Sequence, residues 1–509
     1  MRRVHIELQR VQTWLFSAPR LRAMVGANTL LGETLRVSLP KLAREGGAWA
    51  LSPAMEPYPA ADSQDPLKDH DDPAADAQDG ILARDGGHFE ALFANGADAF
   101  ASKAAALLRR ELPGLRFRIS IDRDEWKKSA VHLSTELPVL APCEWTGRGL
   151  ASEDVQQGDE HASVSMEVQR RHEAAKRAER GQASDLASLL VATTNLKDFR
   201  RVVELKELVG SGYIALIHAD GNGVGSGAGK TEVERAAFFH GTRVLLRRAV
   251  QKAIDVFCAV ALSSGNSRQR EQAPLIPLML GGDDLLVVCR ADTALPFVVA
   301  LCKALAETPR GEARFELTLG VGVVLAKHTI PIHRLHEVSE QLAGSAKRRF
   351  RGFPKDAPRS VVDWAVYSTA WIDDPEEVRR RDWVRGTGRD LRVLSQRPVD
   401  VLGSGLDSLQ GLLRGAEKIV AAPRSQFHYL VEQLSRGRAL SELAFAELSR
   451  EARTALKNVG LEQVWRRSGD DGPWLTEVLD LVEVSEIGRL GSSHAALDAP
   501  EPVEEAIDG

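Results

Sequence analysis

The clearest candidates for chemistry are two adjacent acids, Asp283 and Asp284, which follow Gly281 and Gly282. Apolar runs flank these four residues on both sides, so the pattern predicts two buried strands joined by a tight turn that carries the acids. Adjacent carboxylates beside apolar strands repel each other and lose hydration unless a cation lies between them. Glycine and aspartate are also ordinary hairpin residues, so the turn alone leaves a purely structural interpretation open.

A third acid, Asp220, has a comparable position earlier in the chain. The apolar strand that starts at Tyr213 runs into Asp220, and the turn of Gly221, Asn222 and Gly223 follows before a helix. Glycine lets backbone N–H groups approach phosphate, and the N-terminal end of a helix adds a favourable potential. We therefore expect Asp220 and the hairpin acids to form a divalent-metal site beside a nucleotide.

One basic side chain, Lys347, is a candidate to complete this site. It lies near the end of a helix predicted from Leu335 to Phe350, next to Arg348 and Arg349. A basic cluster at a helix end is often only a solvated terminus that complements the helix dipole. If the helix packs beside the acidic strands, Lys347 would instead reach nucleotide phosphates and neutralise part of their charge.

Composition places the chain among ordinary globular proteins. Its 509 residues, 43% hydrophobic and 27% charged, suffice for several domains. The net charge of −5 excludes a general polyanion binder, so a nucleic-acid surface would have to be a local patch. No signal sequence and no apolar run of about 18 residues is visible, so we expect a cytoplasmic protein with no membrane partner.

The order of the predicted elements repeats along the chain. Around the acidic hairpin it is strand, helix, hairpin, helix and strand, from Tyr213 to Ala326. The same order runs from Val4 to Ile121, with a hairpin at Gly86-Gly87 that carries His88 in place of an acid. We infer an internal duplication in which only the second copy keeps acids at its turn.

These motifs resemble the large, polymerase-like subunit of type III CRISPR effector complexes. Asp220–Gly225, Gly281–Asp284 and Ser345–Lys347 are similar to its second palm domain, and Val11–Phe16 resembles its degenerate first palm. Pro423–Gln426, in a helical region, resembles its terminal domain. The resemblance implies a nucleotidyltransferase that joins ATP into cyclic oligoadenylate second messengers in antiviral defence when target RNA is bound.

The resemblance also implies roles for the candidate residues. Asp220, Asp283 and Asp284 would be the catalytic acids that hold two Mg²⁺ or Mn²⁺ ions, and Lys347 would contact the phosphates of ATP. Two such ions activate an attacking 3′-hydroxyl and stabilise the pyrophosphate leaving group. The remaining nucleotide-binding residues would be Gly221, Asn222, Gly223, Gly281 and Gly282. Guide RNA, target RNA and other effector subunits are the implied partners.

The expected fold is α+β, with two ferredoxin-like palm domains, a linker and an all-helical C-terminal domain. Palm-like sequence begins at residue 3, so we expect no histidine-aspartate nuclease domain. Cys143 has no cysteine partner and Thr146 stands where a second one would be, so we expect no zinc and only free thiols. The predicted parts are a first palm at 1–140 with a solvated acidic insertion at 52–80 that contains His70 and Asp71, a linker with a vestigial zinc motif at 141–205, a second palm at 206–368, a helical domain at 369–490 and a disordered acidic tail at 491–509.

Two other functions stay open. A stand-alone nucleotide cyclase or dinucleotide synthase would share the chemistry. Two features argue against it: the turn reads Gly-Gly-Asp-Asp in place of Gly-Gly-Asp/Glu-Glu-Phe, and no sensor domain is visible. A non-catalytic RNA-binding scaffold would need no acids, and the presence of all three argues against it.

Overall fold

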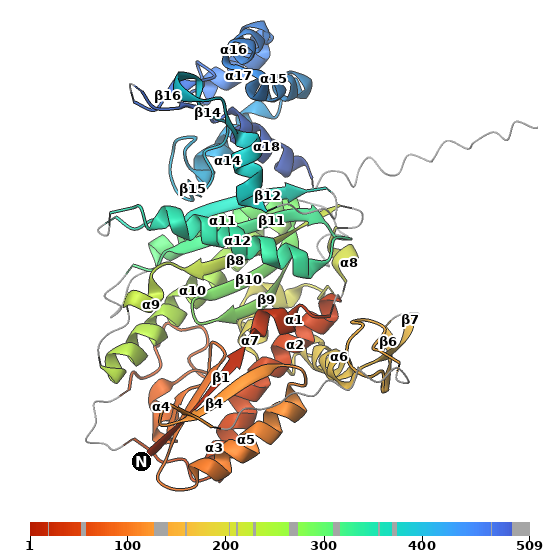
Figure 1. The fold of residues 1–509 in the computed structure, drawn as a ribbon, viewed down its shortest axis with the longest axis vertical. Helices are drawn as coiled ribbons and strands as arrows, with labels where there is room; N and C mark the ends of the chain where they lie inside the picture. The colour runs from red at the N-terminus through yellow and green to blue at the C-terminus, as the bar shows by residue number, and fades with distance from the viewer. Residues whose placement is uncertain are drawn as a thin grey trace, which may run out of the picture.

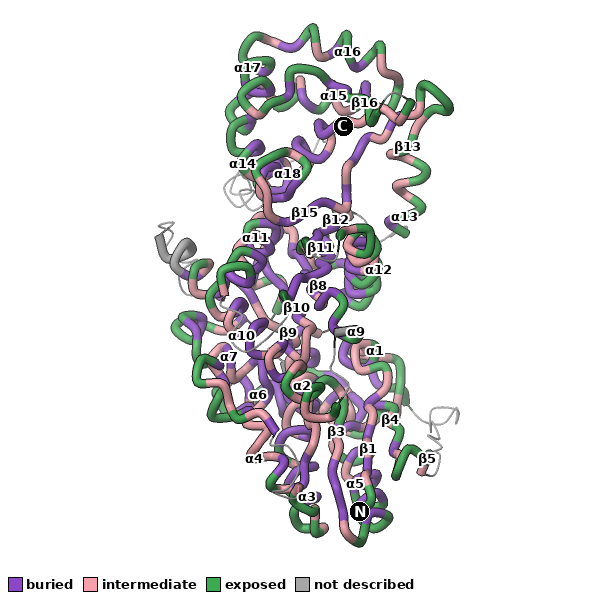
Figure 2. The backbone as a smooth tube through the Cα atoms, turned by 90° about the vertical axis from the view of Figure 1, so that its left-hand side faces the viewer, coloured by how far each residue is buried: buried purple, intermediate pink, exposed green. Residues whose placement is uncertain are grey.

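Three regions follow one another along the long axis of the computed structural model: an N-terminal α/β unit, a central sheet with its helices, and a group of C-terminal helices (Figure 1). One cluster of buried hydrophobic side chains runs through all three, from Val4 to Ile487. Buried stretches of backbone lie in each of the three regions (Figure 2). The structure describes residues 1–509 except 19, 52–57, 127–140, 158–159, 203, 210–211, 228–230, 264–272, 309–315, 355–356, 369–373, 470 and 491–509.

The N-terminal unit is built on a five-stranded sheet in the order β2-β3-β1-β4-β5. Its middle strand β1 alternates buried Val4, Ile6 and Leu8 with partly exposed polar residues, as expected for a sheet with one apolar face. Helix α5 packs against β1 and β4. The elements are β1 (Arg2–Gln9), α1 (Val11–Leu15), α2 (Leu21–Glu33), α3 (Leu39–Glu45), α4 (Pro73–Gln78), β2 (Ile81–Ala83), β3 (His88–Phe93), α5 (Ala97–Glu111), β4 (Arg116–Ile121) and β5 (Asp124–Glu125).

The central sheet has six strands in the order β15-β12-β11-β8-β10-β9. Strand β8 lies between β10 and β11 and is antiparallel to both. Because helices pack against it, β8 is a continuous buried run rather than an alternating pattern. The elements are β8 (Tyr213–Gly221), α9 (Val224–Gly227), α10 (Glu232–Ser263), β9 (Leu275–Gly281), β10 (Asp284–Arg290), α11 (Ala291–Glu307), β11 (Leu319–Lys327), α12 (Ile332–Phe350) and β12 (Val361–Tyr367).

The predicted duplication is confirmed in the topology. The order β2-β3-β1-β4 of the N-terminal sheet is repeated as β9-β10-β8-β11 in the central sheet. Each unit also has the same hydrogen bond from its middle strand to its hairpin turn. The Leu8 N–H donates to the Gly87 carbonyl at 2.8 Å, and the Gly221 N–H donates to the Asp283 carbonyl at 3.2 Å. The two hairpin turns therefore have equivalent places, one at each middle strand.

The C-terminal region is mainly helical, and the prediction that it is all helical is wrong. Four two-residue strands form a small sheet, and β15 (Val399–Asp400) returns to pair with β12. Strands of two residues are too short to show a period in sequence. The other strands are β13 (Val384–Arg385), β14 (Arg392–Val393), β16 (Arg466–Arg467) and β17 (Trp474–Leu475), and the main helices are α14 (Leu409–Ile419), α15 (Arg424–Arg436), α16 (Arg438–Glu447), α17 (Arg450–Asn458) and α18 (Val478–Arg489).

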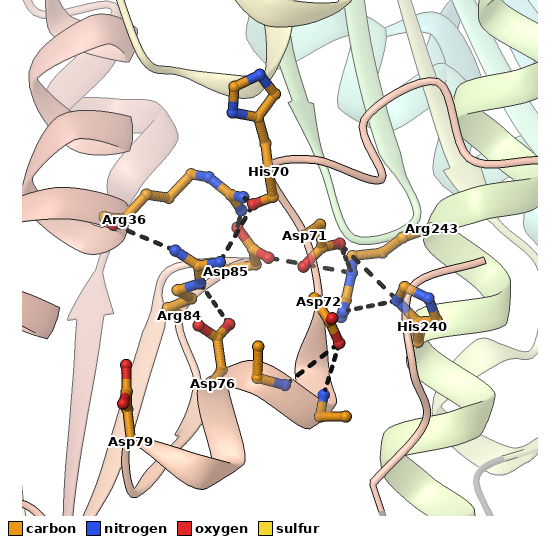
Figure 3. A network of polar contacts seen from close by, with 12 residues as sticks. Arg36, His70, Asp71, Asp72, Asp76, Asp79, Arg84, Asp85, His240 and Arg243 are labelled. Carbon is orange, nitrogen blue, oxygen red and sulfur yellow. Dashed lines mark hydrogen bonds and ion pairs between the residues drawn. The ribbon is translucent and has the colours of Figure 1, made fainter. Parts of the chain in front are cut away.

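The acidic insertion is not a solvated loop over its described residues, 58–80. Asp65 and Asp71 are buried, and Arg247 of α10 donates to both carboxylates, at 2.8 and 2.7 Å. Arg243 of α10 donates to Asp71 as well, at 3.2 Å, as Figure 3 shows. The prediction failed because the arginines that compensate these aspartates lie some 170 residues further along the chain. The insertion ties the N-terminal unit to the central one.

The linker region carries helices α6 (Met166–Glu179) and α7 (Leu186–Thr193) and a small hairpin of β6 (Glu153–Gln157) and β7 (Glu160–Val164). Cys143 is buried in a separate small core beside this hairpin. All four cysteines are free and buried, which confirms the expectation of free thiols. Within the described ranges, no helix is long and apolar enough to span a bilayer. The predicted tail at 491–509 lies outside the described residues.

Candidate active site

The three predicted acids meet at one end of the central sheet. Asp284 is the register partner of Asp220 across β10 and β8. Asp283 lies in the turn before β10 and packs over Gly221, where an added Cβ would come within 2.8 Å of the Asp283 Oδ2 atom. Gly282 has a φ of 61°, which glycine adopts without strain and which lets the hairpin turn this tightly. The sheet thus brings together acids that lie 63 residues apart in sequence.

Burial and mutual repulsion disfavour the ionised forms of these acids. Burial, and then the Asp284 carboxylate, raise the pKa of Asp220 to about 6, against a lowering effect of Lys347. The pKa of Asp283 is also raised, mainly by burial and then by Asp284. Among the described residues, the buried Oδ1 atom of Asp284 has no hydrogen-bond partner, and the His218 Nε2 atom lies 3.7 Å from it. The site holds more negative charge than its neighbours compensate.

Lys347 reaches the acids from α12. Its ammonium group donates a hydrogen bond to the Asp220 carboxylate. The path of the side chain crosses Gly320 of β11, where an added Cβ would lie 2.7 Å from the Lys347 Cγ atom. The helix itself lies close to the strand, because a Cβ at Gly322 would come within 2.1 Å of the Ser339 carbonyl oxygen. The structure therefore places Lys347 beside the acids, with the Asp220 carboxylate as its partner.

The turn after Asp220 is held by Thr318. The Asn222 N–H donates to the Thr318 carbonyl at 2.8 Å, and the Asn222 side-chain amide donates to the Thr318 hydroxyl at 3.1 Å. The Oδ1 atom of Asn222 is buried and unpartnered. The four-residue α9 follows the turn directly, and the long helix α10 starts only at Glu232. We therefore assign no helix-dipole contribution to this turn.

A cavity of about 690 Å³ lies between the two units, beside the acids. The N-terminal unit contributes Arg10, Gly86 and Gly87 to its wall, and the central unit contributes Gly281 and Asp284. A second cavity of about 500 Å³ is lined by His88, Gly282 and Asp283. Because Asp85 and Gly86 line both cavities, the hairpin turns of the two units face each other with one cavity on either side.

The sequence did not reveal a ring stack beside the acids. His336 of α12 stacks on His218 of β8, with ring centroids 5.8 Å apart, and on Phe16 of the N-terminal unit at 4.4 Å. Burial, and then His218, lower the pKa of His336 to about 3, so its ring is neutral near pH 7. The stack joins the two units next to Asp284. No sequence spacing relates residues 16, 218 and 336, so only the tertiary structure shows it.

The acids fit a hard divalent cation in their chemistry, although they do not enclose one. Among the described residues, no group of three or more His, Cys, Asp or Glu side chains is arranged to hold a metal ion. Asp220 is turned to the Lys347 ammonium, which takes the place of a cation. Carboxylate oxygens are the ligands that Mg²⁺ and Mn²⁺ prefer, and the unpartnered Asp284 Oδ1 atom is one of them.

Strands β9, β10, β8 and β11 form the antiparallel part of the central sheet, with acids at the end of β8 and in the adjoining hairpin. Residues 213–355 match the family model for the second palm domain of Cas10/Cmr2. The chain therefore carries a palm domain of the Cas10/Cmr2 family, and the resemblance stated from the motifs is confirmed for this part.

Several solved structures are similar to most of the chain. Csm1 from T. onnurineus has 13% identity and a TM-score of 0.49, and the match covers 96% of this chain and 69% of that one. A Csm1-Csm4 cassette in complex with cA4 has 12% identity and a TM-score of 0.47, over 95% and 69% of the two chains. The cassette in complex with AMPPNP has 14% identity and a TM-score of 0.46, over 96% and 69%. No curated protein matches the chain in sequence.

Proposed function

We propose that this protein is the large subunit of a type III CRISPR effector complex and that it joins ATP into cyclic oligoadenylates when target RNA is bound. The convergence of Asp220, Asp283 and Asp284 beside the inter-unit cavity, within a Cas10/Cmr2 palm segment, carries this proposal. The N-terminal unit is then a degenerate first palm, and guide RNA and the other effector subunits are the partners.

The cavity suits the substrate in size and position. Its volume of about 690 Å³ lies in the range of small-molecule sites, and the acids lie at its edge rather than on open surface. The Asn222 Oδ1 atom, which has no hydrogen-bond partner in the described part of the chain, and the turn at Gly282 border the same acids. ATP placed here would lie between the two turns, with its triphosphate within reach of the acids of the central unit.

Asp220, Asp283 and Asp284 would hold Mg²⁺ or Mn²⁺. When bound, these ions supply charge neutralisation at the α-phosphate and activation of the 3′-hydroxyl. The chain itself supplies the positions of Asp220 and Asp284, which the β8–β10 register sets, and the cationic side chain of Lys347. Lys347 would leave Asp220 when the carboxylate binds a cation and would then donate to the phosphates. No side-chain general base is required.

A non-catalytic RNA-binding scaffold is the second candidate, and the Asp220–Lys347 ion pair is the observation that favours it. A lysine that stays on Asp220 would exclude a cation and leave the palm silent. The two candidates differ in one measurable property, which is whether ATP is consumed.

The test is incubation of the protein, with its partner subunits and with or without target RNA, with ATP and Mg²⁺ or Mn²⁺. We expect RNA-dependent cyclic oligoadenylates in a mass spectrum of the products. Linear or dinucleotide products without RNA would indicate a stand-alone synthase, and intact ATP under all conditions would indicate the scaffold.

A further inference from the structure

We propose that Arg10, from the N-terminal unit, binds the phosphate chain of the nucleotide held between the units. The inference rests on the proposed function, and it adds a residue that lies outside the Cas10/Cmr2 palm segment. Three observations carry it: the backbone conformation of Arg10, the absence of a partner for its side chain among the described residues, and its place on the cavity wall.

The backbone of Arg10 has an unusual conformation for its residue type. Its φ of 53° and ψ of 41° are left-handed, and it directly precedes helix α1. Leu8 and Gly221 are equivalent, because each donates the hydrogen bond to its hairpin turn. Two residues further along, Arg10 is therefore equivalent to Gly223, which has a φ of 69°. Glycine adopts this conformation freely, whereas a residue with a Cβ is strained by about 1 kcal/mol or more. The N-terminal unit therefore accepts strain to place a long cationic side chain here.

The guanidinium of Arg10 is not used to hold the fold. Arg10 is exposed, and its side chain makes no hydrogen bond or ion pair with the part of the chain that the structure describes. The other arginine of the N-terminal unit on the same cavity wall, Arg36, instead donates to Asp85 at 2.7 Å and to the His70 carbonyl. Strain without an internal partner is typical of a residue that acts on a ligand.

The place of Arg10 indicates which ligand it binds. It lines the cavity of about 690 Å³ together with Gly86 and Gly87 on its own side and with Gly281 and Asp284 on the other. A ligand in this cavity would have carboxylates that can hold cations at one wall and a free guanidinium at the other. A nucleoside triphosphate complements both, because its phosphates bind divalent cations and accept two parallel hydrogen bonds from one guanidinium.

Replacement by glycine separates this role from a structural one. Arg10→Gly removes the guanidinium and the strain together, so we expect unchanged or higher thermal stability with a loss of nucleotide binding of about tenfold or more. Arg10→Lys keeps the charge but not the paired donors, so its affinity should lie between those of Arg10→Gly and the parent. The matched control is Arg123→Gly, because Arg123 is also left-handed, with a φ of 76°, and exposed in the turn after β4, away from the cavity.

The measurement is calorimetric titration of the full-length protein with a non-hydrolysable ATP analogue and Mg²⁺, together with thermal unfolding. Weaker binding by Arg10→Gly at undiminished stability, with parental binding by Arg123→Gly, supports the proposal. Parental binding by Arg10→Gly, or equal weakening in both variants, overturns it. If the parent binds the analogue but converts no ATP, the proposed function fails, while the comparison of the variants still decides the role of Arg10.

Discussion

The two α/β units of this protein share a topology and differ in what their turns can do. Their strand orders and turn hydrogen bonds coincide, which makes Asp220 equivalent to Glu7 and Asp284 equivalent to His88. The central turn carries Asp283 where the N-terminal turn has Gly87. The fold of the turn therefore does not depend on its acids, and the acids of the central unit are available for chemistry.

The two units also differ in the strand that follows the middle strand in the sheet order, which is β11 beside β8 and β4 beside β1. Asp220 pairs in register with Gly320 of β11, whereas Glu7 pairs with Arg118 of β4. The small residues of β11 allow α12 to approach and Lys347 to pass, which a side chain on the strand would prevent. Within the ranges that the structure describes, only the central unit thus has a helix with a lysine over its acids. The glycines of β11 are the physical reason, because they let α12 come close.

The largest effect should follow from removal of the hairpin acids. Asp283→Ala with Asp284→Ala should abolish ATP conversion, a loss of about a thousandfold or more, because no other carboxylate of the turn can replace them. Product formation measured by mass spectrometry gives the result, and circular dichroism shows that the protein is folded.

The matched control is His88→Ala, at the equivalent turn position of the N-terminal unit. It should retain most of the activity. Equal losses of ATP conversion in both variants would contradict the conclusion that only the central turn carries the chemistry. An active double alanine variant would refute the assignment of the acids.

Among the variants that affect stability, the largest effect should follow from a change in the buried ion pairs of Asp71, which join the two units. As far as the structure describes the chain, Asp71→Ala leaves Arg243 with only the ion pair to Asp85 at 4.0 Å and Arg247 with only that to Asp65, so two arginines lose compensation in a buried place, which costs about 3–5 kcal/mol. The free energy of unfolding in urea gives the value. Asp79→Ala, which breaks an exposed pair with Arg44 inside the N-terminal unit, should change it by less than about 1 kcal/mol. Similar values for both variants would show that the buried network does not join the units.

A smaller loss should follow from a methyl group between β11 and α12. Gly322→Ala places a Cβ 2.1 Å from the Ser339 carbonyl oxygen, so the helix must move, at a cost of about 1–3 kcal/mol. Gly344→Ala, in the same helix, meets only the end of Arg348 at 3.8 Å and should be neutral or stabilising. Thermal unfolding distinguishes the two, and a neutral Gly322→Ala would contradict the close approach of α12.

The smallest expected effect concerns how stability depends on pH. Asp220 and Asp122 should change the free energy of unfolding with pH in opposite directions. The folded pKa of Asp220, about 6, exceeds its ordinary value of 3.8, so its contribution favours the folded state at low pH and is lost as pH rises from about 4 to 6. The pKa of Asp122 in the N-terminal unit is lowered, first by the Arg3 backbone N–H and then by Arg2, so its contribution is lost as pH falls below the ordinary value.

Urea unfolding at several pH values tests this pair. Asp220→Asn should remove a decline in stability between about pH 4 and 6, and Asp122→Asn should remove a decline on the acid side of about pH 4. Slopes of the same sign for both residues would contradict the assignment of burial and repulsion as the cause of the Asp220 shift.

Local pattern was sufficient for the strands, helices and acids of the palm. The apolar runs around Gly281–Asp284 and before Asp220 predicted β9, β10 and β8. The strands depend on neighbours within a few residues, so the sequence expresses them directly.

Partners distant in sequence decided the rest. An aspartate in an acidic stretch reads as solvated, and only the fold brings Arg243 and Arg247 to bury Asp71. Likewise, the sequence by itself determined that Lys347 ends a basic helix, and the tertiary structure placed its ammonium on Asp220 by way of Gly320. The physical reason is the same in both cases: compensation of a buried charge depends on distances in space, which a linear pattern does not contain.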